Sequence, residues 1–311
     1  MAEFSHQPVL LQECISGLNI RPEGIYVDGT LGRAGHAREI AARLDGGRLI
    51  AIDRDQAALD AAPARFGALL DRVTLVHGNF SHLPSILDTL GVGTVDGILL
   101  DLGVSSPQLD DASRGFSYMQ DAPLDMRMDR SQSLTAAEVV NVWPEEELRE
   151  IIGRWGEERY AGRIAAAICR RRQAQEIRTT LELVEVIRSA MPAQALREKQ
   201  HPAKRTFQAL RIAVNDELTA VAQAMDAAID RLSPGGRLCV ISFHSLEDRI
   251  VKTAMAQAAR GCTCPPEFPV CTCGKKPKVL LKPRKPILPS PAEVGENPRA
   301  RSAKLRICQR C

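Results

Sequence analysis

Apolar runs alternate with segments of helical periodicity along the first third of the chain. The runs are nearly continuous in apolar residues, which is typical of strands buried on both faces of a sheet. The segments between them repeat apolar residues every three or four positions, as helices do. The predicted strands are residues 24–29, 47–53, 72–78 and 95–103, and the predicted helices are residues 35–44, 55–66 with a break at Pro63, and 81–91. This order predicts an α/β fold with a parallel sheet.

A different pattern follows Ser105. Residues 107–200 show no strand pattern and contain long segments of helical spacing. From Phe207 to Leu232 apolar residues recur at steps of three or four, which predicts one long buried helix. A strand over residues 237–243 and a last edge strand over residues 303–309 complete the prediction.

These elements predict two domains. A Rossmann-like, doubly wound sheet domain takes residues 1–106 and 204–311, and an all-helical domain, residues 107–203, is inserted into it. In such sheets ligands bind beyond the carboxyl ends of the strands. The residues that follow each predicted strand are therefore the first candidates for a functional site.

Composition excludes some classes of protein. The 311 residues are 44% apolar and 25% charged, and no apolar run is long enough to span a bilayer. The first residues lack the pattern of a secretory signal, so we expect a cytoplasmic protein without a membrane partner. Nine cysteines, an odd number, then favour free thiols or metal ligands over a disulfide framework.

The net charge of +3 is unevenly distributed. Residues 275–311 contain eleven Lys or Arg and two Glu, a net +9, so the rest of the chain carries −6. A basic C-terminal tail of this kind is either a solvated appendage or an arm that contacts phosphate.

Candidate site residues stand at the ends of the predicted strands. The turn after the first strand has Asp28 and then glycines at every third position, 29, 32 and 35, which differs from the G-x-G-x-x-G pattern of dinucleotide sites. Asp53 ends the second strand, where a carboxylate can accept the hydroxyls of a ribose. Phe80 follows the third strand and could pack on an adenine, although a lone Phe is more often core. Asp101 ends an apolar strand, where an unpaired carboxylate is costly and usually functional.

Several long blocks resemble the RsmH family, formerly MraW, of ribosomal RNA small subunit methyltransferases. The blocks cover nearly the whole chain in the family's order and include "DGTLGRAGH", "VDGILLDLGVSSPQLDDASRGFSYMQDAPLDMRMD", "HPAKRTFQALRIAVNDEL" and "LSPGGRLCVISFHSLEDRIVK". The resemblance implies a methyltransferase sheet with a helical insertion and S-adenosyl-L-methionine as methyl donor. It also implies that the acceptor is N4 of a cytidine in 16S rRNA, in the decoding region of the small ribosomal subunit.

The resemblance also assigns cofactor contacts to residues of this sequence. They are Ala34, Gly35, His36, Asp53, Phe80, Asp101 and Gln108. Asp101 is the candidate catalytic residue, as an acceptor for an N4 hydrogen, or it only holds the cofactor. His244 could also reach the site, with a structural role as the alternative.

RNA contacts are predicted from two basic clusters. Arg170, Arg171 and Arg172 lie in the insertion, and Lys204, Arg205 and Arg211 surround a predicted helix start. Basic side chains that face phosphate give salt-dependent affinity, although a solvated helix face explains each cluster equally well.

Two C-x-C pairs form a separate motif near the C-terminus. Cys262, Cys264, Cys271 and Cys273 could hold a tetrahedral zinc ion, but the spacing is shorter than in most zinc sites. Reduced thiols or an oxidised pair are the alternatives.

Two other functions stay open at the level of sequence. A DNA amino-methyltransferase would share the fold and the cofactor, and a non-catalytic RNA assembly factor would bind the cofactor without turnover. The sequence leaves the oligomeric state open, including a homodimer.

Overall fold

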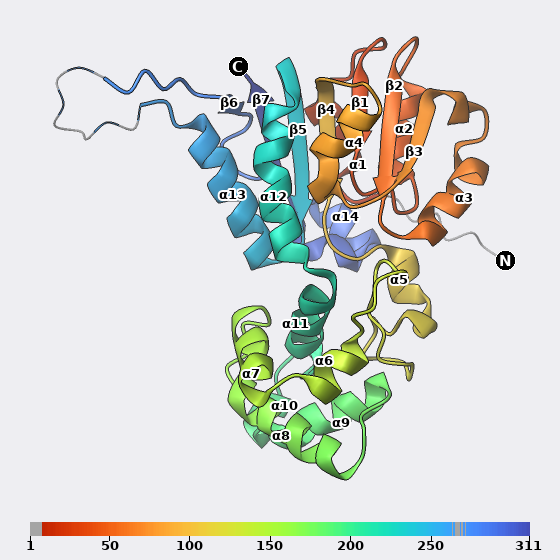
Figure 1. Ribbon diagram of the computed structural model, residues 1–311, viewed down its shortest axis with the longest axis vertical. Helices are drawn as coiled ribbons and strands as arrows, with labels where there is room; N and C mark the ends of the chain where they lie inside the picture. Colours follow the sequence, from red (N-terminus) through yellow and green to blue (C-terminus); the bar gives the residue numbers. More distant parts are fainter. Residues whose placement is uncertain (1–7, 263, 265–267, 269, 271) are drawn as a thin grey trace. The chain divides into compact units, whose positions relative to one another are not determined.

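The computed structural model describes residues 8–262, 264, 268, 270 and 272–311. The chain forms two compact units (Figure 1). The sheet unit combines Met1–Gly103 with Leu218–Cys311, and the helical unit is Val104–Glu217. Within the described ranges, no helix combines the length and the apolar character that crossing a bilayer requires.

The sheet unit contains one seven-stranded sheet in the order β3-β2-β1-β4-β5-β7-β6. The strands are β1 Ile25–Asp28, β2 Arg48–Asp53, β3 Val73–His77, β4 Val95–Asp101, β5 Leu232–Ser242, β6 Val279–Leu281 and β7 Lys304–Arg310. The first five strands pair in parallel, whereas β7 runs antiparallel to both β5 and β6. The predicted α/β fold with a Rossmann-like sheet is therefore confirmed.

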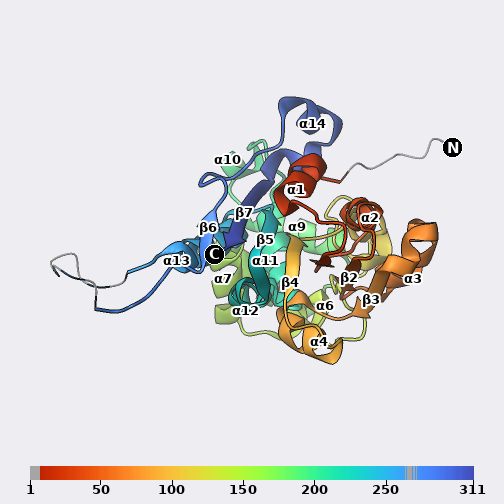
Figure 2. The ribbon, with the colours of Figure 1, turned by 90° about the horizontal axis from the view of Figure 1, so that it is seen from above.

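Helices cover both faces of this sheet, with α1 and α2 on one side and α4 and α12 on the other (Figure 2). The helices are α1 Leu11–Leu18, α2 Gly35–Ala42, α3 Gln56–Phe66, α4 Leu83–Thr89, α12 Glu217–Asp230, α13 Ser245–Ala259 and α14 Pro291–Glu296, with 3-10 turns η1 Gly67–Arg72, η2 Phe80–His82 and η4 Pro298–Ser302. Consecutive residues of β4 enter different cores, because Leu99 packs with α1 and α2 while Ile98 and Leu100 pack with α4 and α12. Burial on both faces explains why the strands are continuous apolar runs.

The predicted break of a helix at Pro63 is wrong. Helix α3 continues through this proline to Phe66. Pro63 lies one turn from the helix end, so its missing N–H removes a single intrahelical bond. Its carbonyl still accepts a hydrogen bond from the N–H of Gly67, which caps the helix.

The predicted long helix is also wrong, because it is two helices. Helix α11, Lys204–Asn215, ends at Asp216, whose φ of 47° is left-handed, and α12 begins at the next residue. The apolar stripe continues across the break but divides between two cores. Phe207 and Val214 pack inside the helical unit, whereas Met225 packs against the sheet. Apolar spacing alone cannot show that its two halves face different cores.

The C-terminal region is more ordered than a solvated tail. Strand β7 was predicted to be an edge strand, but β6 pairs with it and takes the edge. Strand β5 begins earlier than predicted, at Leu232, because a bulge between Val95 and Gly97 accommodates the Pro-Gly turn within the pairing with β4. A strand of three residues, such as β6, is too short to be predicted from an apolar pattern.

The helical unit packs around one apolar core. Its elements are α5 Ser106–Asp110, η3 Ala112–Arg114, α6 Ala136–Val142, α7 Glu145–Arg154, α8 Ala161–Ala174, α9 Thr180–Ala190, α10 Ala193–Leu196 and α11. Residues 107–200, all of them described, contain no strand, as expected. Helix α11 contributes Phe207, Leu210 and Val214 to this core, so the unit ends at Glu217 and not at the predicted residue 203.

Asn215 connects α11 to the loop before α6. Its side chain is 1% exposed. Its Oδ1 accepts from the N–H of Met128 at 2.8 Å, and its Nδ2 donates to the carbonyl of Met126 at 2.7 Å. Both loop groups would lose a buried partner if this amide were removed.

We predict that Asn215→Ala lowers the free energy of unfolding of the helical unit by about 2–4 kcal/mol, because each abandoned buried group costs roughly 1–3 kcal/mol. Both tryptophans, Trp143 and Trp155, lie in this unit, so urea unfolding followed by tryptophan fluorescence reports on it selectively. The control is Gln173→Ala at an exposed position of α8. Equal unfolding midpoints for the two variants would contradict the role of Asn215.

Candidate active site

Three aspartates mark the carboxyl edge of the parallel strands. Asp28, Asp53 and Asp101 are the last residues of β1, β2 and β4. Parallel pairing places the carboxyl ends of these neighbouring strands at the same edge. The sheet therefore gathers three carboxyl groups where ligands bind in this class of fold.

The turn from β1 to α2 is closely packed against its surroundings. A Cβ on Gly29 would lie 2.5 Å from Leu100 Cδ2, and one on Gly35 would lie 2.3 Å from Pro8 Cγ. These two glycines are therefore required by packing within the protein. Ala34, at the N-cap of α2, has a left-handed φ of 61°, a conformation that is strained for a residue with a side chain.

Asp53 connects this turn to β2. Its Oδ2 accepts from the N–H of Gly32 at 2.7 Å, and its Oδ1 accepts from the N–H of Asp55 at 2.8 Å. Burial raises the pKa of Asp53 above its usual range. Each oxygen keeps a further lone pair, so the carboxyl group can still accept hydrogen bonds from a ligand. Asp55 itself is the N-cap of α3.

Asp28 and Thr30 were not among the predicted cofactor or catalytic residues. The carboxyl group of Asp28, 1% exposed, accepts from the N–H of Thr30 at 3.0 Å, and burial raises the pKa of Asp28 to about 7. Thr30 Oγ1 accepts from the N–H of Asp101 at 2.7 Å and so connects the ends of β1 and β4. The available signal was the acid immediately before the glycine-rich turn.

Asp101 has an oxygen with no protein partner. Its side chain is 28% exposed, yet Oδ1 is buried and makes no hydrogen bond within the described structure. Desolvation, together with the nearby charges of Asp28 and Glu247, raises the pKa of Asp101 to about 8. A buried acceptor without a donor is unfavourable unless a ligand supplies one.

His36 approaches Asp101 without neutralising it. Its Nε2 lies 3.0 Å from the carbonyl oxygen of Val9 and donates to it, which leaves Nδ1 as an acceptor 3.7 Å from Asp101 Oδ2. Burial lowers the pKa of His36 to about 4, so the ring is neutral at pH 7. The structure thus brings His36 and Asp101 together as an uncharged ring and a carboxyl group.

Phe80 lies beside the same turn. It begins η2 directly after β3, and its Cβ would be 3.1 Å from a Cβ on Gly29. The ring is half-buried against the core that contains α4. The sheet unit therefore gathers six of the seven predicted cofactor residues around its carboxyl edge: Ala34, Gly35, His36, Asp53, Phe80 and Asp101. Their contacts with a cofactor stay a prediction.

Gln108 belongs to the helical unit. It is buried, and its Oε1 accepts from the N–H of Ser105 at 3.0 Å in a capping box at the start of α5. This interaction explains a buried glutamine at that position without a ligand. A cofactor contact by Gln108 stays a prediction.

The geometry around His244 supports a structural role for this residue. His244 is the N-cap of α13, where its Nδ1 accepts from the N–H of Glu247 at 3.4 Å. Its Nε2 lies 3.1 Å from the buried carboxyl group of Glu247. The Nδ1 atom therefore caps the start of a helix, whereas the buried Nε2 makes no hydrogen bond within the described structure.

The predicted RNA-binding residues differ in whether their side chains are exposed or already hydrogen-bonded within the protein. Arg170, Lys204 and Arg205 are exposed. By contrast, Arg211 donates from Nε and Nη2 to the carboxylate of Glu217 at 2.8 and 2.9 Å, and Arg172 donates to the carbonyl of Val140. Arg171 donates to the carbonyl of Gln175. RNA binding by these six residues stays a prediction.

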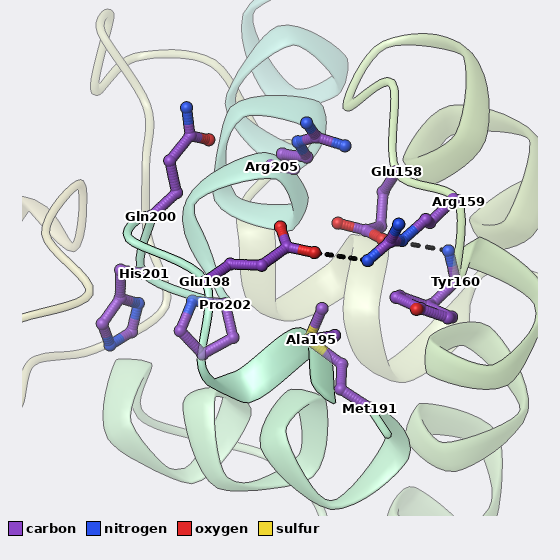
Figure 3. A pocket seen from close by; sticks show the side chains of 10 residues that line it. All are labelled: Glu158, Arg159, Tyr160, Met191, Ala195, Glu198, Gln200, His201, Pro202 and Arg205. Atoms are coloured by element: carbon purple, nitrogen blue, oxygen red, sulfur yellow. Dashed lines mark hydrogen bonds and ion pairs between the residues drawn. The ribbon is translucent and has the colours of Figure 1, made fainter. Parts of the chain in front are cut away.

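A small pocket of the helical unit adjoins Arg205 (Figure 3). Arg159 pairs with Glu198 there and lies 4.7 Å from the centre of the Tyr160 ring, while Arg205 donates to the carbonyl of Glu157. The cations on this wall thus already interact with acceptors of the protein. The lining residues are Glu158, Arg159, Tyr160, Met191, Ala195, Glu198, Gln200, His201, Pro202 and Arg205.

Two groups stand out among the eleven basic residues of the C-terminal region. Lys304 and Arg306 pair with Asp248, and Lys278 and Arg310 pair with Asp230, so these four charges are partly offset within the fold. Others are exposed and have no carboxylate partner among the described residues: Lys275, Lys276, Lys282, Arg284 and Lys285. This second group is available to phosphate.

Comparison with known proteins identifies the family. The model of the MraW methylase family matches residues 3–311. "Ribosomal RNA small subunit methyltransferase H" of Brevibacillus brevis is 57% identical over 308 residues, which cover 99% of this chain and 98% of the relative. The protein of the same name from Symbiobacterium thermophilum is 56% identical over 304 residues, 97% of this chain and 96% of the relative. A solved putative rRNA methylase from Clostridium thermocellum is 10% identical, with a TM-score of 0.48 over 98% of each chain. On the family match and these identities, the chain belongs to the MraW methylase family.

Proposed function

We propose that this chain transfers a methyl group from S-adenosyl-L-methionine to N4 of a cytidine in 16S rRNA, in the decoding region of the small ribosomal subunit. Membership of the MraW methylase family and relatives named ribosomal RNA small subunit methyltransferase H support methylation of rRNA. Within the site, the observation that carries the proposal is the buried Oδ1 of Asp101, an acceptor without a donor beside a neutral histidine.

The residues at the carboxyl edge fit the proposed cofactor. Asp53 offers two carboxylate oxygens to the ribose hydroxyls, and Phe80 offers a ring face to the adenine. Asp101 offers its partnerless oxygen toward a cationic or N–H group. When bound, S-adenosyl-L-methionine supplies an activated methyl group on a cationic sulfonium.

Asp101 is also suited to the proton that the reaction releases. Methylation of an amine replaces one N–H bond by an N–C bond, so the amine must lose a proton. A carboxyl group with its pKa raised to about 8 is a better proton acceptor, once ionised, than an ordinary aspartate. A nearby cation favours the ionised form. We assign this acceptor role to Asp101, with positioning of the amine as its second contribution.

The stretch after β4 differs from that of common amino-methyltransferases. Asp101 is followed by Leu102, Gly103 and Val104 in place of a Pro-Pro-aromatic sequence. Leu102 donates its N–H to the carbonyl of Ile241 at 3.0 Å, so that group is committed to the sheet. The side chain of Asp101 is therefore our candidate for orienting the target amine.

The decisive experiment is nucleoside mass spectrometry of methyl-deficient small subunits incubated with the protein and labelled cofactor. The proposal expects labelled N4-methylcytidine from 16S rRNA and none from duplex DNA. Label in DNA would support a DNA amino-methyltransferase instead. Cofactor binding without any labelled nucleoside would support a non-catalytic assembly factor.

We predict that Asp53→Ala weakens binding of S-adenosyl-L-methionine about 10- to 100-fold, because charge-assisted hydrogen bonds to the ribose contribute roughly 1.5–3 kcal/mol. Isothermal titration calorimetry measures the change directly. Asp60→Ala, an exposed acid on α3, is the matched control. Unchanged affinity in Asp53→Ala would remove this residue from the site.

We predict that cofactor affinity increases with pH between about 6 and 8. The pKa of Asp101 is raised to about 8, so the group is mostly protonated at pH 6 and ionises as the pH rises. A cationic ligand binds the ionised form better, which gives up to about a tenfold increase per pH unit.

Asp101→Asn should flatten this pH dependence. Asp28→Asn measures how much of the dependence comes from the neighbouring carboxyl group, whose pKa is raised to about 7. With saturating cofactor, Asp101→Asn should also lower turnover about 100-fold or more, as loss of a general base does. A wild-type affinity that does not change with pH, or full turnover in Asp101→Asn, would contradict the assignment.

We further propose that the exposed C-terminal cations contact RNA phosphates. The combined change Lys282→Gln, Arg284→Gln and Lys285→Gln should weaken RNA binding and reduce the slope of log affinity against log salt by up to about 2. The control is Arg21→Gln, Arg38→Gln and Arg43→Gln, three exposed cations elsewhere on the sheet unit. Equal affinities and slopes for the two variants would make the tail only a solvated appendage.

A further inference from the structure

Three cysteine side chains gather just beyond the end of α13. The Sγ atoms of Cys262, Cys264 and Cys273 all lie within 4.8 Å of one another. Cys262 Sγ and Cys273 Sγ are 3.7 Å apart, although eleven positions separate them in the chain. The group is near the surface, since Cys262 and Cys273 are exposed and Cys264 is partly buried.

These separations fit a tetrahedral metal site. With a zinc–sulfur distance of about 2.3 Å, two thiolates on a tetrahedral zinc ion are ~3.8 Å apart. The 3.7 Å between Cys262 and Cys273 agrees with that value. A disulfide would require about 2.05 Å between sulfur atoms. The third thiol, within 4.8 Å of both, completes a triangular face on which one ion can sit.

Polar groups around the thiols suit negatively charged sulfur. The backbone N–H of Cys264 donates to Cys262 Sγ at 3.3 Å, and Thr272 Oγ1 lies 3.7 Å from Cys264 Sγ. Such outer partners orient metal-bound ligands. Exposed Lys275 and Lys276 follow directly and add positive charge to this part of the chain.

The remaining described cysteines have a different environment. Cys14, Cys239 and Cys308 are buried in the apolar cores of the sheet unit, and Cys169 and Cys311 lie elsewhere in the chain. A buried thiol packed among apolar side chains behaves as a small hydrophobic residue. Only the group after α13 combines three thiols, access to solvent and polar partners among the described residues.

We propose that Cys262, Cys264 and Cys273 bind one structural zinc ion as thiolates. Cys271, the fourth cysteine of the predicted motif, lies outside the described residues and is not part of the proposed site. Soft thiolate ligands in tetrahedral geometry select zinc over magnesium or calcium. Bound zinc joins Cys262, three residues after α13, to Cys273, six residues before β6, and its binding energy is available only when these thiols are together.

The test uses the full chain, stripped of metal with a chelator under reducing conditions. Zinc binding is measured by competition with a chromophoric chelator, and cobalt(II) serves as a spectroscopic substitute. The proposal expects one equivalent of tightly bound zinc, and the cobalt form should show thiolate-to-metal charge transfer with the intense visible bands of tetrahedral geometry.

Cys262→Ser combined with Cys273→Ser should weaken zinc binding by more than the roughly 100-fold that loss of an outer partner causes. Cys169→Ser combined with Cys311→Ser is the matched control and should bind zinc as the wild type does. Circular dichroism checks that both variants are folded.

Three results would overturn the proposal. They are the absence of zinc binding at micromolar concentration, a cobalt spectrum without thiolate charge transfer, and equal zinc affinity in the two double variants. None of these readouts depends on methyl transfer, so the proposed function and the proposed metal site fail separately.

Discussion

The hydrogen bond from the N–H of Gly32 to the carboxyl group of Asp53 connects the two central features of the sheet unit, the glycine-rich turn and the end of β2. Two further bonds extend it: Thr30 N–H donates to Asp28, and Asp101 N–H donates to Thr30 Oγ1. Strands β2, β1 and β4 are thereby joined at their carboxyl ends by side chains as well as by the ladder. This chain of contacts fixes the glycine-rich turn relative to Asp53 and Asp101.

The same arrangement sets the electrostatics of the site. Burial is the largest cause of the raised pKa values of Asp28, Asp53 and Asp101. Neighbouring carboxyl groups add to it, since Asp53 raises the pKa of Asp28 and Asp28 raises that of Asp101. The imidazole ring of His36 in this site has its pKa lowered by burial and contributes no positive charge. A site of this kind favours a ligand that brings a cation and hydrogen-bond donors with it, which is the character of the proposed cofactor.

The break between α11 and α12 has a local cause. Asp216 takes a left-handed conformation, while Asn215 beside it is held by three backbone groups of the helical unit. The left-handed conformation of one residue costs little free energy. Burial of the two apolar stripes, each of which contains several large side chains, contributes much more. Helix α11 therefore stays with the helical core, and α12 covers the sheet.

The sequence by itself determined the fold class, the first four strands and the position of Asp53 and Asp101 at strand ends. These features follow from continuous apolar runs and from single acids at their ends, which are local signals. Only the tertiary structure decided that α11 and α12 are separate, that α3 continues through Pro63, and that β6 covers β7. It also decided that Arg211 donates to the carboxylate of Glu217. The same holds for the thiols of Cys262 and Cys273, which lie close together although eleven positions separate them in the chain. Such outcomes depend on contacts between residues distant along the chain, where the gain from packing or pairing outweighs local propensity, and a one-dimensional pattern does not contain them.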